Sequence, residues 1–118
     1  MPHYMLLLHD DPSQYADKSG EEMMVLVQDY MAWTERMRAA GRYVGGEKLR
    51  DDAGRVLRRV DGATRVHDGP YSEAREVLGG YMTISAADYE EACALVQDHP
   101  HLAYGGTIEL RAVEALDA

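Results

Sequence analysis

Side chains able to transfer protons or bind a metal gather where the predicted strands and helices of this 118-residue chain end. A histidine beside a carboxylate can act as a general acid or base near neutral pH, because its unperturbed pKa is near 6.5 and the carboxylate fixes its tautomer. The residues of this kind are His9, Asp10, Asp11, Glu47, His67, Asp68, Tyr71, His99 and His101.

The same imidazoles offer a second chemistry, since His9, His99 and His101 could together bind zinc or another transition metal. An isolated His-x-His pair is a weak metal signal, however, and helix capping, loop contacts or solvent exposure is the competing interpretation for each histidine. The single Cys93 also excludes a cysteine-cluster site. We therefore predict no metal and no other cofactor.

Two helices and four strands must position these residues. Ser19 with Glu22 forms a capping box, and Gly41 suits a helix C-terminus, which predicts a helix of about 20 residues between them. A second helix is predicted to start at an N-cap Ser85 and to stop at Pro100. Its predicted buried stripe consists of Tyr89, Ala92, Cys93 and Val96.

Short apolar or alternating segments predict the strands, which cover residues 3–10, 42–49, 79–85 and 106–113. The pair Gly45-Gly46 suggests a bulge or a close backbone approach in the second of them. Residues 55–69 alternate around Asp61-Gly62, the favoured dipeptide of a two-residue turn, and predict an inserted, arginine-rich hairpin.

This order of elements is the split βαβ pattern of an α+β, ferredoxin-like antiparallel sheet with an inserted hairpin and both helices on one face. The helix-free face must be covered, which predicts a homodimer packed sheet against sheet. The topology also brings the histidines and carboxylates named above to one rim of the sheet. Of the five histidines, only His3 falls at the other end.

Composition limits the function classes. The formal charge of −9 argues against nucleic acid and anionic membrane surfaces, which both need clustered lysine and arginine. No apolar run is long enough to span a bilayer, and no secretion signal is evident, so we expect a cytoplasmic protein. The length fits a single domain, residues 1–118.

The stretch "DGPYSEAREVLGGY", residues 68–81, closely resembles the signature of the YCII-related proteins of the DGPF type. The likeness extends to "YMLLL", "AAGRYVGGEKL" and "HPHLAYGGTIELR". It implies a ferredoxin-like fold paired into a dimeric α/β barrel, a His/Asp pair in a cleft in some relatives, and a link to sigma factors. One departure concerns the mechanism: the histidine that the wider family carries on its first helix is matched here by Tyr30.

Two functions remain open. The first is an enzyme acting on a small aromatic or carbonyl-containing molecule, with a histidine that shuttles a proton, a carboxylate that orients it, and a pocket between helix and sheet. The candidate catalytic residues are His99, His101, His9 and Asp68, with Asp10 as an alternative orienting group, and the candidate binding residues are Tyr30, Trp33, Tyr71 and Glu47. The second is a non-catalytic small-ligand-binding or regulatory module, with an acidic rim that a sigma factor could meet.

Overall fold

The computed structural model of the chain describes residues 1–69 and 76–116. Its elements are β1 (His3–Asp10), the 3-10 helix η1 (Pro12–Tyr15), α1 (Gly20–Ala39), β2 (Tyr43–Lys48), β3 (Arg55–Val60), β4 (Ala63–Asp68), β5 (Val77–Ser85), α2 (Tyr89–Val96), α3 (Pro100–Ala103) and β6 (Thr107–Ala112).

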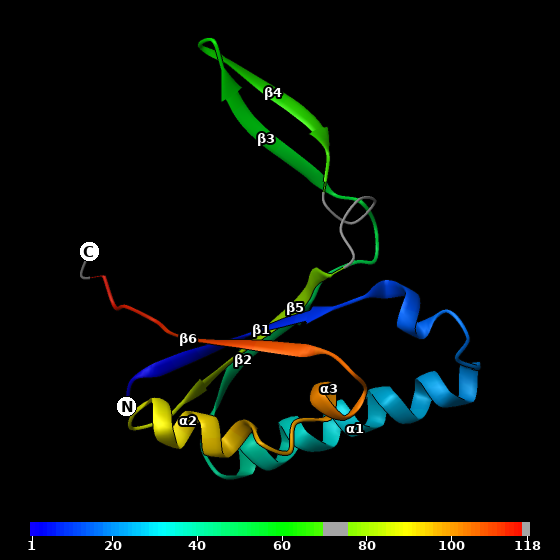
Figure 1. The fold of residues 1–118 in the computed structure, drawn as a ribbon. Helices are drawn as coiled ribbons and strands as arrows, with labels where there is room; N and C mark the ends of the chain where they lie inside the picture. Colours follow the sequence, from blue (N-terminus) through cyan, green and yellow to red (C-terminus); the bar gives the residue numbers. More distant parts are fainter. Residues whose placement is uncertain (70–75, 117–118) are drawn as a thin grey trace.

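One four-stranded sheet forms the body of the molecule, in the order β2-β5-β1-β6, and all of its neighbouring strands are antiparallel. The helices α1, α2 and α3 lie on one face of this sheet, and the hairpin β3–β4 is a separate two-stranded sheet that projects from it (Figure 1). The α+β class and the inserted hairpin are therefore confirmed, and the strand order is consistent with a ferredoxin-like fold.

The core lies between the sheet and the helices because alternate residues of each strand point to opposite faces. Tyr4, Leu6 and Leu8 of β1 are at most 7% exposed and pack against Trp33 and Met37 of α1. The residues between them, Met5 and Leu7, are half-buried on the other face. In Figure 1, none of the helices in the described part of the chain covers that outer face.

Local signals placed the first helix and the hairpin correctly. Ser19 caps α1, its hydroxyl accepting from Glu22 N–H while the Glu22 carboxylate accepts from Ser19 N–H. Gly41 after the helix has the left-handed φ of 72° that glycine adopts without strain. Asp61 and Gly62 form the tight turn with φ values of 52° and 79°.

The predicted limits and buried stripe of the second helix were wrong. Ser85 is the last residue of β5, and Asp88 caps α2 by accepting from Glu91 N–H. Pro100 does not end the second helix, which already ends at Val96. It starts the short helix α3 instead, because proline fits a first helical position, where an N–H is not needed. Cys93 is exposed and Tyr89 is half exposed, so the buried side of α2 is the narrower strip formed by Ala92 and Val96.

The helices found in residues 1–69 and 76–116 include none that is both long and apolar enough to cross a membrane.

Candidate functional site

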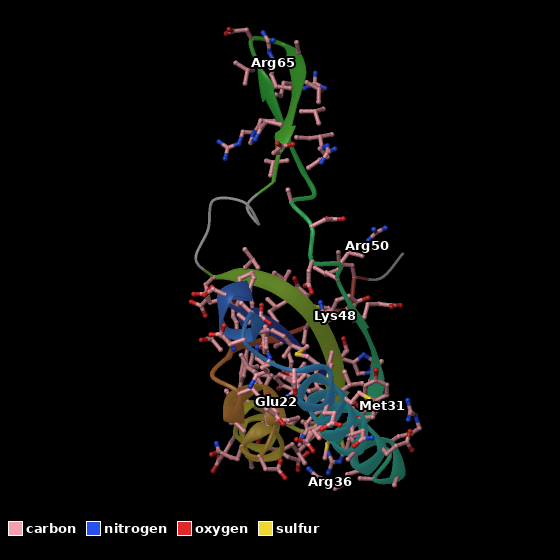
Figure 2. The ribbon with its side chains drawn as sticks, turned by 90° about the vertical axis from the view of Figure 1, so that its right-hand side faces the viewer. Glu22, Met31, Arg36, Lys48, Arg50 and Arg65 are labelled. Atoms are coloured by element: carbon pink, nitrogen blue, oxygen red, sulfur yellow. The ribbon has the colours of Figure 1, made fainter. Side chains whose placement is uncertain are left out.

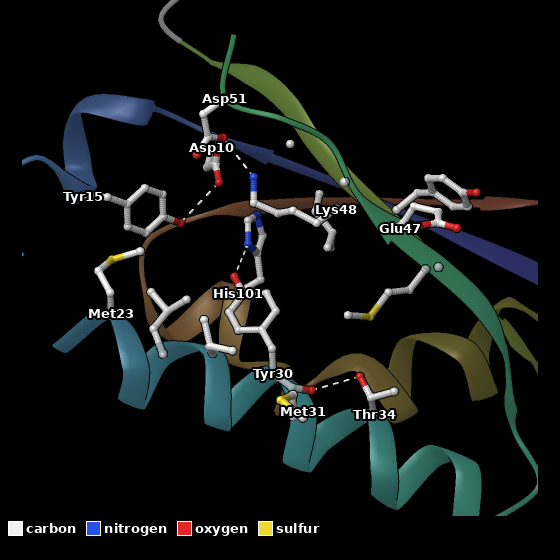
Figure 3. Close-up of a pocket in the computed structure, with 18 of the residues that line it drawn as sticks. Asp10, Tyr15, Met23, Tyr30, Met31, Thr34, Glu47, Lys48, Asp51 and His101 are labelled. Atoms are coloured by element: carbon white, nitrogen blue, oxygen red, sulfur yellow. Dashed lines mark hydrogen bonds and ion pairs between the residues drawn. The ribbon is translucent and has the colours of Figure 1, made fainter. Parts of the chain in front are cut away.

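A cavity of about 650 Å³ lies between α1 and the strands β2 and β5. Most residues of its helix wall are apolar, and the wall consists of Met23, Leu26, Val27, Tyr30, Met31, Thr34, Glu35 and Arg38. Asp10, Tyr15 and His101 line it at the end near η1 and α3, as Figure 3 shows. Val27 and Met31 are 50% and 63% exposed, so apolar surface of α1 faces open space here.

The cavity exists because its floor is made of glycines. Gly46 and Gly80 lie on the inner face of β2 and β5, where larger side chains would fill the space below α1. A Cβ on Gly46 would come within 2.6 Å of the Tyr81 carbonyl oxygen, and one on Gly80 within 2.8 Å of the Glu47 carbonyl oxygen. The strands approach so closely at these two positions that only glycine fits, which accounts for one glycine of each Gly-Gly pair.

His101 and Tyr30 form the most buried polar contact of the cavity wall. His101 is 2% exposed, and its Nε2 lies 2.8 Å from the carbonyl oxygen of His9, which can only accept. The proton of the imidazole is therefore on Nε2, and Nδ1 accepts from the Tyr30 hydroxyl at 2.5 Å. Gly106 leaves room for this ring, since a Cβ there would lie 2.2 Å from Nε2. Both nitrogens of His101 are thus engaged, which holds the Tyr30 ring in place.

Asp10 brings a carboxylate to the same cavity. It ends β1 beyond a register shift between Leu8 and His9, and a Cβ on Gly79 would lie 3.3 Å from its Oδ1. The Tyr15 hydroxyl donates to its Oδ2 at 3.3 Å. In residues 1–69 and 76–116, no lysine or arginine forms an ion pair with Asp10.

The two phenols are donors at neutral pH. Burial, followed by the charge of Asp10, raises the pKa of Tyr15 to about 12. Burial is also the largest reason why the pKa of Tyr30 is raised, with Tyr15 and Asp10 adding to it. Both hydroxyls therefore keep their protons. The described carboxylates of the cavity wall are Asp10, Glu35, Glu47 and Asp51, and Asp10 is the one that accepts from Tyr15.

His99 lies in the core and does not line the cavity. It is 1% exposed, its Nδ1 accepts the His101 backbone N–H as the N-cap of α3, and its Nε2 lies 3.4 Å from Met82 Sδ. Burial lowers its pKa from 6.5 to about 4, so the ring is neutral at pH 7. Trp33, whose ring centroid is 4.4 Å from that of His99, is also core and donates its Nε1–H to Asp98.

His9 and Glu47 belong to the other face of the sheet. The His9 Nε2 lies 3.1 Å from Glu109 Oε1, and His9 does not line the cavity. Its carbonyl oxygen accepts from Nε2 of His101, which does line it. Glu47 is paired with Tyr81, which is paired with Leu7, and these residues alternate with the inward-facing ones. Glu47 is nevertheless among the residues that line the cavity, although the strand alternation puts its side chain on the face away from α1.

Asp68 ends β4 on the projecting hairpin, where it is exposed and lies 3.8 Å from Arg55. It is therefore not among the cavity residues. Tyr71 lies outside the described residues. In the described part of the chain, no three histidine, cysteine or carboxylate side chains gather closely enough to bind a metal ion, and His9, His99 and His101 each face different partners.

Ion pairs lie at the borders of the cavity. Lys48 Nζ lies 2.9 Å from Asp51 Oδ1, and Arg38 pairs with Glu35 one turn earlier on α1. Sequence reasoning did not single out Tyr15 or Lys48, because a tyrosine in a short 3-10 helix and a lysine at a strand end carry no motif. The presence of one Gly-Gly segment on each of two neighbouring strands was the signal that could have located the cavity.

The fold and the cavity define a small α+β protein with a partly apolar, carboxylate-bearing cavity between its first helix and its sheet. The family model of the YCII-related domain matches residues 2–117, and the chain belongs to this family. It is similar to an uncharacterized protein of Rhizobium meliloti (strain 1021), with 31% identity over 96 residues that cover 80% of this chain and 77% of that protein.

Proposed function

We propose that the chain binds a small, mostly apolar molecule in this cavity and transfers a proton to or from it, with Asp10 as the base. The observation that carries the proposal is the Asp10 carboxylate in the cavity wall, with a tyrosine hydroxyl as its hydrogen-bond donor and no described cation paired with it. A carbonyl compound suits this arrangement, since a carboxylate removes a proton next to the carbonyl while a phenol donates to its oxygen.

Tyr15 is the donor in this scheme. Its hydroxyl lies 3.3 Å from Asp10, a long hydrogen bond that a ligand oxygen can replace. Tyr30 is committed to His101 at 2.5 Å and is a positioning residue. The predicted His/Asp pair is therefore replaced in this proposal by an Asp/Tyr pair, and His101 acts through Tyr30.

The second candidate is a binding module without catalysis. It is favoured by the engagement of both nitrogens of His101, the one imidazole that lines the cavity among the described residues. Cytoplasmic location, the DGPF subtype, the single domain and a sigma-factor association stay predictions.

We also propose that two copies pack through the outer face of the sheet into a dimeric α/β barrel. Support comes from Met5, Leu7 and Tyr81, which are half-buried side chains on a face that none of the helices in residues 1–69 and 76–116 covers. Such faces are normally buried in another layer.

The test compares the wild type with Asp10→Asn and with Glu109→Gln, a control that removes one carboxylate from the opposite face. Binding of a panel of small aromatic and aliphatic ketones is measured by NMR in D₂O, which also reports exchange of the hydrogens next to the carbonyl. We expect exchange in the wild type and the control, and a loss of about 10²-fold or more in Asp10→Asn. Binding without exchange would favour the non-catalytic module, and absence of binding would refute both functions.

A further inference from the structure

The hairpin β3–β4 stands away from the body of the protein. Figures 1 and 2 show both strands projecting, with Arg65 on the distal part of the hairpin. Eleven of its twelve strand residues are exposed and Val56 is the exception. The radius of gyration is 16.5 Å, against about 13.5 Å for a compact chain of this length, so the molecule is extended for its size.

Such a hairpin is poorly stabilised in isolation. A two-stranded hairpin is marginally stable in water unless another surface covers one of its faces. One face carries the cross-strand pair Leu57 and Val66, which are 62% and 59% exposed. The other face places Arg58 directly opposite Arg65, and like charges in that position are destabilising. An apolar surface covering the first face would therefore stabilise the hairpin, and so would negative charge next to the second face.

The charge distribution of the chain indicates what supplies that negative charge. Residues 55–68 hold four arginines and two aspartates, a net charge of +2, so the remaining residues of a chain of charge −9 carry −11. Within the described residues, Arg58, Arg59 and Arg65 form no ion pair. A basic arm on a strongly acidic body is electrostatically complementary to the body of another copy.

The base of the hairpin is held in place, which makes a defined contact possible. Gly69 N–H donates to the Gly54 carbonyl oxygen at 3.3 Å, and Arg55 lies 3.8 Å from Asp68 across the first strand pair.

The outer face of the four-stranded sheet is by itself too small to form a stable dimer interface. Four strands about 4.8 Å apart and about 20 Å long give a flat area of roughly 400 Å², whereas stable interfaces take about 800 Å² from each partner.

We propose that the β3–β4 hairpin is a docking arm that packs on the acidic surface of a second copy of this chain. In a twofold dimer each copy gives one arm and receives one, so the contact is made twice. Leu57 and Val66 provide its apolar part, and Arg58 with Arg65 meets carboxylates of the second copy. The arm adds to the sheet-to-sheet pairing proposed above and is tested separately from it.

The experiment measures the dimer dissociation constant of the full chain by sedimentation velocity for four variants. Arg58→Glu with Arg65→Glu removes the charge contact, and Leu57→Thr with Val66→Thr removes the apolar contact while keeping residues that favour strands. Arg50→Glu is the charge control, since Arg50 is exposed and lies outside the hairpin. Leu7→Glu disrupts only the outer sheet face. Hydrogen exchange of the amides of residues 55–68 is followed above and below the dissociation constant.

We expect both hairpin variants to weaken the dimer at least tenfold and Arg50→Glu to change it less than threefold. The hairpin amides should exchange more slowly in the dimer than in the monomer. Unchanged dissociation constants in both hairpin variants, or equally fast exchange in dimer and monomer, would overturn the proposal. So would a chain that stays monomeric at millimolar concentration or whose hairpin amides are protected only by added nucleic acid. Loss of the dimer in Leu7→Glu alone would support sheet pairing without the arm.

Discussion

Removing the imidazole of His99 should make the free energy of unfolding depend less on pH below neutrality. The ring is 1% exposed and neutral in the folded protein, with a pKa lowered by burial from 6.5 to about 4. The unfolded chain takes up a proton below pH 6.5, which the folded chain resists until about pH 4. The stability that the neutral His99 ring contributes to the folded protein is therefore complete above pH 6.5 and is lost as the pH falls towards 4.

The size of the effect follows from the shift of the pKa. A difference of about 2.5 pKa units corresponds to at most about 3 kcal/mol, of which about 2 kcal/mol is lost between pH 7 and pH 5. Asparagine at position 99 can still cap α3 but does not titrate. In His99→Asn the free energy of unfolding should be lower at every pH, because the packing on Trp33 is lost, yet should depend about 2 kcal/mol less on pH over this range.

The assay is urea unfolding at pH 5, 6 and 7, followed by the fluorescence of the single tryptophan, Trp33, which is 1% exposed. His67→Asn is the matched control, since His67 is exposed on the hairpin. If the free energy of unfolding depended equally on pH in the wild type and in His99→Asn, the assignment of His99 as a buried neutral ring would be refuted. An equally large flattening in His67→Asn would refute it as well.

Three further outcomes follow from single contacts. Tyr30→Phe should lower the free energy of unfolding by about 1–3 kcal/mol in urea unfolding, because His101 Nδ1 then lacks a donor. Gly106→Ala should lower the thermal midpoint by several degrees in a calorimeter, since its Cβ would overlap the His101 ring, and an unchanged midpoint would contradict the packing. Cys93 should react with a thiol reagent in the folded protein as completely as in urea, because it is exposed.

Most of the fold was predictable because its signals are local. The capping box at Ser19 and the Asp61-Gly62 turn each depend on a few neighbouring residues, and both are present. The second helix was mispredicted where two local signals competed. Ser85 and Asp88 are both good capping residues, but Ser85 N–H donates to the Arg42 carbonyl oxygen, so the strand continues to Ser85 and Asp88 is left to cap.

The candidate site was less predictable because it depends on tertiary contacts. Topology placed His101 at the rim of the sheet, but its contact with Tyr30, 71 positions earlier in the chain, was not predicted. The same argument could not tell which imidazole faces the cavity, since His99 and His101 lie on either side of Pro100, and a cap and a first turn point their side chains differently. Asp68 fits the sequence pattern as well as Asp10 does, yet it follows the hairpin out into solvent.

The arrangement of the two histidines affects how any chemistry here must proceed. His99 caps α3 with its Nδ1, and that short helix fixes the His101 ring between the His9 carbonyl and the Tyr30 hydroxyl. A catalytic imidazole must exchange a proton with the substrate, whereas His101 would first have to break one of its two hydrogen bonds inside a buried site. The carboxylate of Asp10 needs only to give up a long bond from Tyr15. This lower cost supports the proposal that Asp10 is the base and that the two histidines hold Tyr30 in the cavity wall.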